Sequence, residues 1–288
     1  MVGGEVVIAA TLAALGSALL YAVASVGQQR LAAAAPARQS LRLGLLVGLA
    51  RRPLWLASML ADLGGYGLQA VALGAGPLVV VQPLLLSGLL FALPLGGALS
   101  GRSLSRAEWL AAVAVSGGLS LFLVAAAPRP GQPDATTAAW LAAGLVTAAA
   151  VAAAVAAARG PQGPRRAALL GLASGLTFGL TAALTKTSVW LLGQGLGRLA
   201  GSWQPYGLAA AGLVGLLLSQ SAFQAGPLAV SLATLSVVDP VASIVLGAVA
   251  FHESVRLGGV APLLELVGLA AALGGTVGLA GAAATPHT

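Results

Sequence analysis

Four ionisable side chains lie inside long apolar stretches of the sequence, where charged groups are expensive. They are Asp62, Lys186, Asp239 and Glu265. On insertion scales, a charged residue near the centre of a bilayer costs about 2.5 to 3.5 kcal/mol, so its presence asks for a reason. Carboxylates in such places carry protons or bind cations, and an ammonium group neutralises a carboxylate or attracts an anion. These four residues are the first candidates for a solute or ion pathway.

Asp239 is the most informative of the four because Pro240 follows it directly. Proline removes a backbone N–H donor and opens the helical hydrogen-bond ladder, which leaves carbonyl oxygens free beside the carboxylate. Asp62 falls near the middle of another apolar stretch. The sequence therefore predicts a proton or cation site at Asp239, with Asp62 as the second carboxylate. If a metal cation is carried, these two residues are its expected ligands.

Lys186 and Glu265 have two interpretations that the sequence leaves open. Both are expected near the same membrane face, at depths that differ by roughly 3 Å for a rise of about 1.5 Å per residue. Lys186 could form a structural ion pair with Glu265, or reach inward to Asp239 and a substrate. A lysine near a helix end also extends toward the membrane interface.

The apolar stretches also contain glutamines, and tryptophans lie near their ends. Gln28, Gln69 and Gln82 are expected to line a polar path, although glutamine also joins helices through hydrogen bonds. Gln82 is the stronger candidate for this path because Pro83 follows it and interrupts the helix. The tryptophans stand near the ends of apolar stretches, as interfacial anchors do; they are Trp55, Trp109, Trp140, Trp190 and Trp203.

The sequence carries no signature of an enzyme. Cysteine is absent, which excludes disulfides, thiolate metal sites and cysteine catalysis. His252 and Glu253 are adjacent, but two residues do not make a metal site. There is no histidine-rich cluster, no phosphate-binding loop and no nucleophile with a base. We expect neither catalysis nor a cofactor.

The elements that position these residues are apolar helices. Only 7% of the 288 residues are charged, against about 25% in soluble domains, and 58% are hydrophobic. A spanning helix needs about 20 apolar residues. Breaks at charged residues, proline and glycine predict nine spans, near residues 6–29, 53–73, 78–99, 107–126, 138–158, 167–191, 205–224, 228–250 and 258–281. Residues 41–50 are too short to span and are expected to lie at the interface. The fold class is therefore an all-α polytopic membrane protein.

The basic residues predict how this protein is oriented. Short cytoplasmic loops carry an excess of lysine and arginine. With the N-terminus outside, the inner loops hold Arg30, Arg38, Arg42, Arg51, Arg52, Arg102, Arg106, Arg159, Arg165 and Arg166, and the outer loops hold Arg129, Arg198 and Arg256. This imbalance predicts an outer N-terminus and an inner C-terminus. The net charge of +7 is therefore loop charge and does not indicate a nucleic acid partner.

The chain also repeats itself. Gly76-Pro77-Leu78 and Gly226-Pro227-Leu228 are 150 residues apart, and the same offset relates Arg106 to Arg256. Ser17 and Tyr21 of the first helix have counterparts in Ser174 and Phe178 of the sixth. The expected organisation is four helices in residues 1–126, a bridging helix and basic linker in residues 127–166, and four helices in residues 167–288. An odd number of spans between equivalent helices makes the second repeat inverted, which is a transporter architecture.

Several motifs are similar to those of the drug/metabolite transporter superfamily. They are Gln28-Gln29-Arg30 at the end of the first helix, the Pro77 to Pro83 segment, Lys186 ahead of glycines, and Phe251-His252-Glu253 after the eighth helix. Within this EamA-like group the chain resembles the NIPA-like magnesium transporter branch. It departs from that branch at Gly65-Tyr66, where relatives carry a polar or acidic residue after the glycine. The resemblance implies a transporter and favours Mg²⁺ as the solute.

The expected function is transport of a small solute or cation by alternating access, in the plasma (inner) membrane of a bacterium. A proton-coupled exporter of an organic metabolite is the alternative, and a non-transporting protein that binds lipid or a partner is a second one. The expected partners are the solute and the lipid bilayer, with no nucleic acid and with a homodimer left open.

Overall fold

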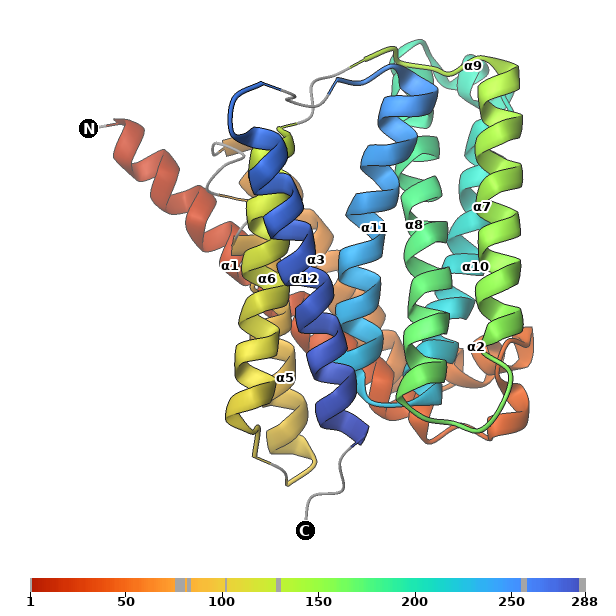
Figure 1. Cartoon of the computed structure of the whole chain (residues 1–288). Coiled ribbons are helices and arrows are strands. Elements are labelled where there is room, and N and C mark those ends of the chain that lie inside the picture. The colour runs from red at the N-terminus through yellow and green to blue at the C-terminus, as the bar shows by residue number, and fades with distance from the viewer. Residues whose placement is uncertain are drawn as a thin grey trace.

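The computed structural model describes residues 2–75, 81, 84–101, 103–127, 131–254 and 258–284. Within these residues the fold is all-α, as predicted, and contains no strand. The helices, shown in Figure 1, are α1 (Val2–Ala33), α2 (Leu43–Ala50), α3 (Pro53–Ala75), α5 (Gly88–Leu99), α6 (Arg106–Ala126), α7 (Thr137–Ala157), α8 (Pro164–Gly193), α9 (Leu196–Ala200), α10 (Gln204–Ala225), α11 (Leu228–Phe251) and α12 (Ala261–Ala284), with a short 3₁₀ turn at Ala37–Gln39.

Long apolar helices make this chain a multi-pass membrane protein. Seven helices are long and apolar enough to cross a membrane, and an eighth is obtained if α2 and α3, which are bent by 96° at their junction, count as one span. The predicted count of nine is therefore not reached among the described residues. The difference lies at the third expected span, where only the shorter apolar helix Leu84–Leu99 is described. Of that span, residues 78–80 and 82–83 are outside the described part of the chain.

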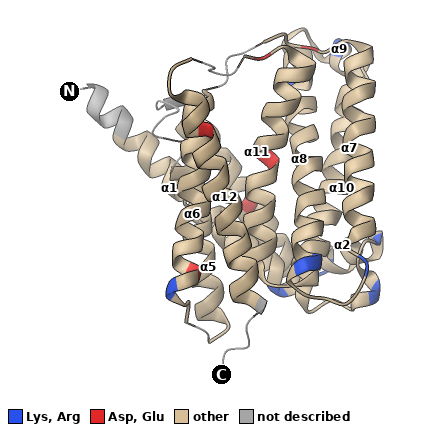
Figure 2. Ribbon diagram, in the orientation of Figure 1, with Lys and Arg blue, Asp and Glu red and all other residues tan. Residues whose placement is uncertain are grey.

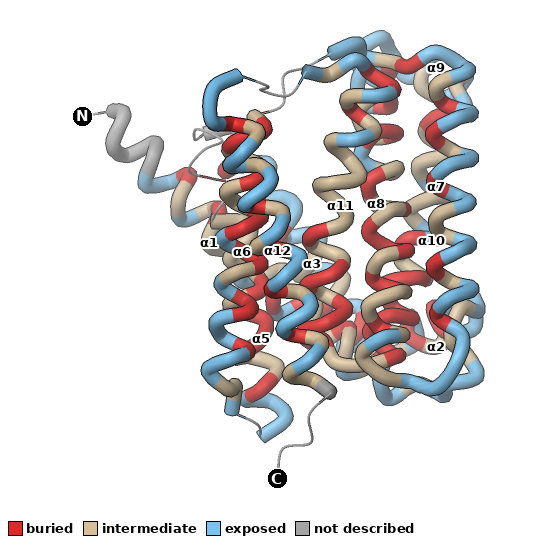
Figure 3. Tube along the Cα trace, in the orientation of Figure 1, coloured by how far each residue is buried: buried red, intermediate tan, exposed pale blue. Residues whose placement is uncertain are grey.

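The surface of the helix bundle is apolar, as a lipid-facing surface must be. Leu60, Leu110 and Val249 are about 70% exposed, although they would be buried in a soluble protein of this size. Figure 3 shows exposed positions along the outward sides of α7 and α12, and buried positions where helices face one another. The buried core is rich in alanine and glycine, because small residues let helix backbones approach closely where lipid leaves no hydrophobic drive for association.

Helices that the predicted repeat would pair run in opposite directions. The free end of α1 and the α9 end of α8 lie at the same end of the bundle in Figure 1, so these two helices are antiparallel. Likewise α6 begins, and α12 ends, at the opposite end. Figure 2 shows most basic residues at that second end, around α2 and the starts of α6 and α8. This distribution is the one on which the predicted orientation depends.

Candidate functional site

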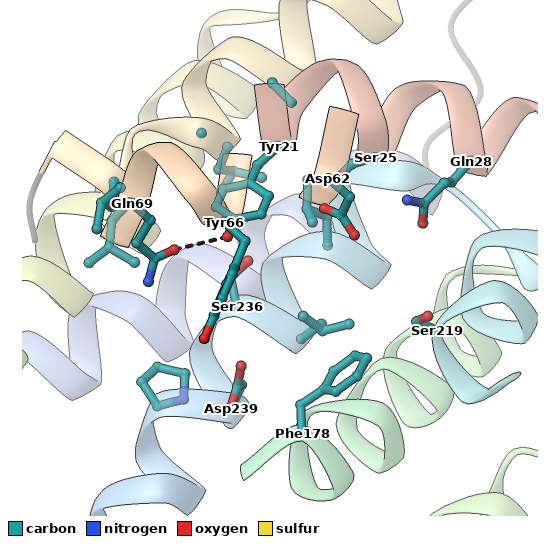
Figure 4. Close-up of a pocket in the computed structure, with 18 of the residues that line it drawn as sticks. Tyr21, Ser25, Gln28, Asp62, Tyr66, Gln69, Phe178, Ser219, Ser236 and Asp239 are labelled. Atoms are coloured by element: carbon teal, nitrogen blue, oxygen red, sulfur yellow. Dashed lines mark hydrogen bonds between the residues drawn. The ribbon is translucent and has the colours of Figure 1, made fainter. Parts of the chain in front are cut away.

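A large cavity lies between the two halves of the bundle. Its volume is about 890 Å³. It is lined by α1, α3, α5 and α6 from the first half and by α8, α10 and α11 from the second, whereas α7 and α12 contribute no lining residue. The lining is mostly apolar, with a few polar groups aimed inward (Figure 4). Pockets of this size and character bind small organic molecules.

Four of the predicted pathway residues meet in this cavity. Asp62, Asp239, Gln28 and Gln69 all line it, although they come from α3, α11, α1 and α3. Figure 4 shows the carboxyl groups of Asp62 and Asp239 entering the space from opposite walls. The lining residues include no lysine, arginine or histidine, so the fixed charge of the cavity comes from these two carboxylates.

A buried chain of hydrogen bonds ends at Gln28, which lines the cavity together with Asp62. The Trp55 indole N–H donates to Oε1 of Gln220 at 3.1 Å, and Nε2 of Gln220 donates to Oε1 of Gln28 at 2.8 Å. An indole N–H can only donate, so this chain has one direction and fixes the orientation of both amides.

The members of this chain are almost inaccessible and come from both halves. Trp55 and Gln28 are 5% exposed and Gln220 is fully buried. Gln28 lies on α1, Trp55 on α3 and Gln220 on α10. A buried polar network of this kind is stable only when each group is paired, so it holds the Gln28 amide in a defined orientation in the cavity wall.

Asp239 is positioned by a proline within its helix and by glycines on the neighbouring helix. Pro240 cannot donate to the carbonyl of Ser236, and Ser236, Asp239 and Pro240 all line the cavity. The Ser243 hydroxyl donates to the Asp239 backbone carbonyl at 2.9 Å and lies 3.4 Å from its Oδ1. The Ser236 carbonyl is therefore the group that lacks a backbone donor from residue 240, which is the opening of the helix that the sequence predicted.

The α8 backbone lies directly against α11 at this point because α8 carries glycines every four residues. They are Gly171, Gly175 and Gly179. A Cβ on Gly175 would lie 2.7 Å from Cβ of Val238 and 3.1 Å from the backbone nitrogen of Asp239. The Gly-x-x-x-Gly spacing is a known sign of close helix packing in membranes, and it could have been found in the sequence.

Two aromatic rings form facing walls of the cavity and are held by equivalent contacts in the two halves. The Ser17 hydroxyl donates to the Gly65 carbonyl at 2.8 Å, and the Tyr21 ring covers Gly65. The contacts of the second half follow the same scheme: the Ser174 hydroxyl donates to the carbonyl of Gly215 at 3.0 Å, and the Phe178 ring covers that glycine.

These contacts explain why the first and sixth helices share a serine and an aromatic residue at matching positions. The Tyr21 hydroxyl is additionally hydrogen-bonded to Oε1 of Gln69 at 2.9 Å. Phenylalanine has no such group, so the two walls differ in polarity although they are built alike.

Lys186 and Glu265 are not among the residues that line the cavity. Lys186 forms its ion pair with Glu253, in the loop after α11, and with neither of the two partners that the sequence left open, Glu265 and Asp239. Its ammonium lies 4.4 Å from the centre of the Phe251 ring. Glu265 is on α12, and its Oε1 is buried without a hydrogen-bond partner among the described residues. Gln82 lies outside the described residues.

Two tryptophans predicted to be interfacial anchors are buried. Trp55 belongs to the hydrogen-bond chain that ends at Gln28, and Trp140 is 6% exposed, with its indole N–H donating to Asp134 at 2.9 Å. Trp140 also packs edge-on against Trp203 and Phe251. Residues that sequence reasoning did not assign to the site include Tyr66, Ser236 and Phe223, which line the cavity without a local motif to mark them.

The carboxylate and hydroxyl oxygens in the cavity suit a charged or polar solute better than a bare divalent ion. Among the described residues, no three His, Cys, Asp or Glu side chains come together as a metal cluster. Mg²⁺ demands near-octahedral oxygen ligation and gives up its waters reluctantly. Two carboxylates and a few hydroxyls could contact a hydrated ion, but they form no cage around a dehydrated one.

Comparisons with known proteins identify a relative. A protein of Corynebacterium glutamicum, described as uncharacterized, is 32% identical to the chain over 249 residues, which are 86% of this chain and 86% of that protein. No family profile matches the chain, and no solved structure does. The match extends over most of both proteins and is not confined to one segment. The chain therefore belongs to the same family as this corynebacterial protein.

Proposed function

We propose that this protein is a membrane transporter of the drug/metabolite type, which moves a positively charged solute by alternating access. The observation that carries the proposal is the cavity between the halves, whose fixed charge consists of Asp62 and Asp239. Ionisable residues that face a cavity inside a membrane mark solute and ion pathways. A scaffold protein has little reason to keep two carboxylates there.

The equivalent construction of the two halves supports this mechanism. The Ser17–Gly65 and Ser174–Gly215 hydrogen bonds join the first and second helices of each proposed repeat, and the helices run in opposite directions. Inverted repeats allow one half to rock against the other around a fixed site. The division into residues 1–126 and 167–288 around a bridging segment is part of this proposal.

A second, smaller cavity suggests where the inner barrier lies. It has a volume of about 180 Å³ and is lined by Gln29, Arg30, Ser100 and the apolar residues Val26, Leu93 and Leu228, among others. Leu89 and Leu232 line the large cavity, and Leu93 and Leu228 line the small one, one helical turn away in each helix. One turn is about 5.4 Å. A thin apolar layer of this kind is what a modest rocking movement could open.

The experiment that tests transport is flux into proteoliposomes that hold the purified protein. Mg²⁺ entry is followed with an internal indicator, and uptake of organic ammonium compounds with radiolabel, under an imposed voltage and an imposed proton gradient. We expect uptake by the native protein and its loss in Asp239→Asn. Glu265→Gln is the matched control, since Glu265 is a carboxylate in a membrane helix that does not line the cavity.

The outcomes separate the candidate functions. Uptake of Mg²⁺ that Asp239→Asn abolishes would place the chain with magnesium transporters, the function favoured by the family resemblance. Coupling of organic solute movement to the proton gradient would indicate a proton-coupled exporter. If no solute moves in verified, folded proteoliposomes, the transport proposal fails and a lipid- or partner-binding role becomes the better explanation.

A further inference from the structure

We infer that the cavity takes an organic cation, a compound with an ammonium group attached to an apolar body. This inference rests on the proposed transport function and names the chemical class of the solute. Three properties of the cavity carry it: the sign of its fixed charge, the aromatic side chains in its wall, and its size.

The charge of the cavity selects for a cation. Asp62 and Asp239 enter from α3 and α11, and no basic side chain among the lining residues balances them. The single lysine of the sequence, Lys186, is engaged by Glu253 and the Phe251 ring outside the cavity. An anionic solute would bring a further negative charge into the space between the two carboxylates, where like charges repel.

The cavity wall contains aromatic rings, which a metal site does not require. Tyr21, Tyr66, Phe178 and Phe223 line the same cavity as the two carboxylates. Figure 4 shows Tyr66 and Phe178 extending into the space beside Asp239. Ring faces attract ammonium groups when these lie within about 6 Å of the ring centre, and the attraction grows when water is excluded. Carboxylates and aromatic rings together are the chemistry that recognises substituted amines.

Two of the rings are fixed in place, so this part of the cavity is prepared before the solute arrives. Tyr21 is held by Gln69 and by its packing on Gly65, and Phe178 by its packing on Gly215. Gln28, which also lines the cavity, is oriented by Gln220. Side chains that do not need to be ordered on binding lose less conformational entropy, and this increases affinity.

The size of the cavity fits an organic body better than an ion. A volume of about 890 Å³ is near the upper end of ligand pockets, which span about 300 to 1,000 Å³. Leu85, Leu86, Leu119 and Leu123 supply an apolar wall for such a body. The small cavity below it, at about 180 Å³, offers no comparable space.

Binding to the purified protein in detergent, followed by calorimetry, tests the solute class separately from transport. The probes are benzyltrimethylammonium as an organic cation, MgCl₂ as a metal and sodium benzoate as an organic anion of similar size. We expect the ammonium probe to bind and benzoate not to bind. Asp62→Asn and Asp239→Asn should each weaken the ammonium probe at least tenfold, and Phe178→Leu by about 3- to 30-fold, whereas Glu265→Gln should leave its affinity unchanged.

Thermal unfolding of each variant in the same detergent verifies that it is folded. The inference is overturned if the folded native protein does not bind the ammonium probe, or if Mg²⁺ or benzoate binds and competes for the cavity instead. Flux distinguishes the two proposals. Transport of Mg²⁺ would leave the transporter proposal standing and refute the organic cation. Asp-dependent binding of the ammonium probe without any flux would support the organic cation as a ligand and refute transport.

Discussion

Gly118 and Gly268 lie against each other where α6 crosses α12, and each occupies the space that a side chain on the other would need. A Cβ on Gly118 would lie 2.6 Å from the carbonyl oxygen of Gly268, and a Cβ on Gly268 would lie 2.6 Å from the carbonyl oxygen of Gly118. The two positions are 150 residues apart, which is the offset of the sequence repeat. A reciprocal contact between equivalent residues is what a twofold relationship between two halves produces.

Substituting Gly118 with alanine should therefore destabilise the protein. The added methyl group would meet backbone atoms of α12, which cannot move without displacing the helix, and such overpacking costs about 1 to 3 kcal/mol. Thermal unfolding in detergent measures the effect. Gly117→Ala is the control on the same helix, since a Cβ there meets no atom within 4 Å. Equal melting temperatures for the two variants would contradict the close contact between α6 and α12.

Replacing Trp55 with phenylalanine should weaken the protein and the cation site together. The variant leaves Oε1 of Gln220 without its donor in a fully buried place, at a cost of about 1 to 3 kcal/mol. Gln28 also loses its fixed orientation, and so we expect weaker binding of the ammonium probe. Trp109→Phe is the matched control because Trp109 is 39% exposed. A Trp55→Phe variant with native stability and affinity would show that the hydrogen-bond chain is not needed.

Gly175→Ala should impair binding and uptake through the position of Asp239. A methyl group at residue 175 would push α8 away from Val238 and the Asp239 backbone. Gly212→Ala adds the same group to α10 where no atom lies within 4 Å, so it should behave as the native protein. The two variants are compared by calorimetry with benzyltrimethylammonium. If they bind equally well, close packing of α8 on α11 does not position the carboxylate.

Removal of the Lys186 charge should affect stability more than solute binding. Lys186 and Glu253 have side chains that are 30% and 21% exposed, and such partly hydrated pairs contribute about 1 kcal/mol or less. We expect Lys186→Met to lower the melting temperature slightly and to leave the affinity for the ammonium probe unchanged. A large change in affinity would mean that this lysine acts on the solute, the role left open by the sequence.

The absence of cysteine makes the inner barrier directly testable. Single cysteines at Leu89 and Leu93 would line the large and the small cavity, respectively. In sealed vesicles of one orientation, we expect a membrane-impermeant maleimide to label only one of them, and the transported solute to change the labelling rate of that cysteine. Labelling of both from the same side would contradict an apolar barrier between these positions.

Much of the helical architecture could be read from the sequence because a membrane leaves few options. Backbone groups inside a bilayer must be paired within a helix or a closed barrel, so long apolar stretches bounded by arginine, proline and glycine become helices. The six later helices from α6 to α12 that exceed spanning length follow this rule, and α2 is too short to span by itself, as predicted. The cost of buried charge likewise identified Asp62 and Asp239 before any contact was known.

Only the tertiary structure decided which polar groups share one space. These helices are apolar on nearly all sides, so sequence periodicity does not reveal how each is rotated toward its neighbours. Lys186 was expected to reach Glu265 or Asp239 on the basis of depth alone, yet it pairs with Glu253 in the loop after α11. The chain from Trp55 through Gln220 to Gln28 joins residues up to 192 positions apart. The sequence determined that polar groups are buried in the membrane, and packing determined which of them meet.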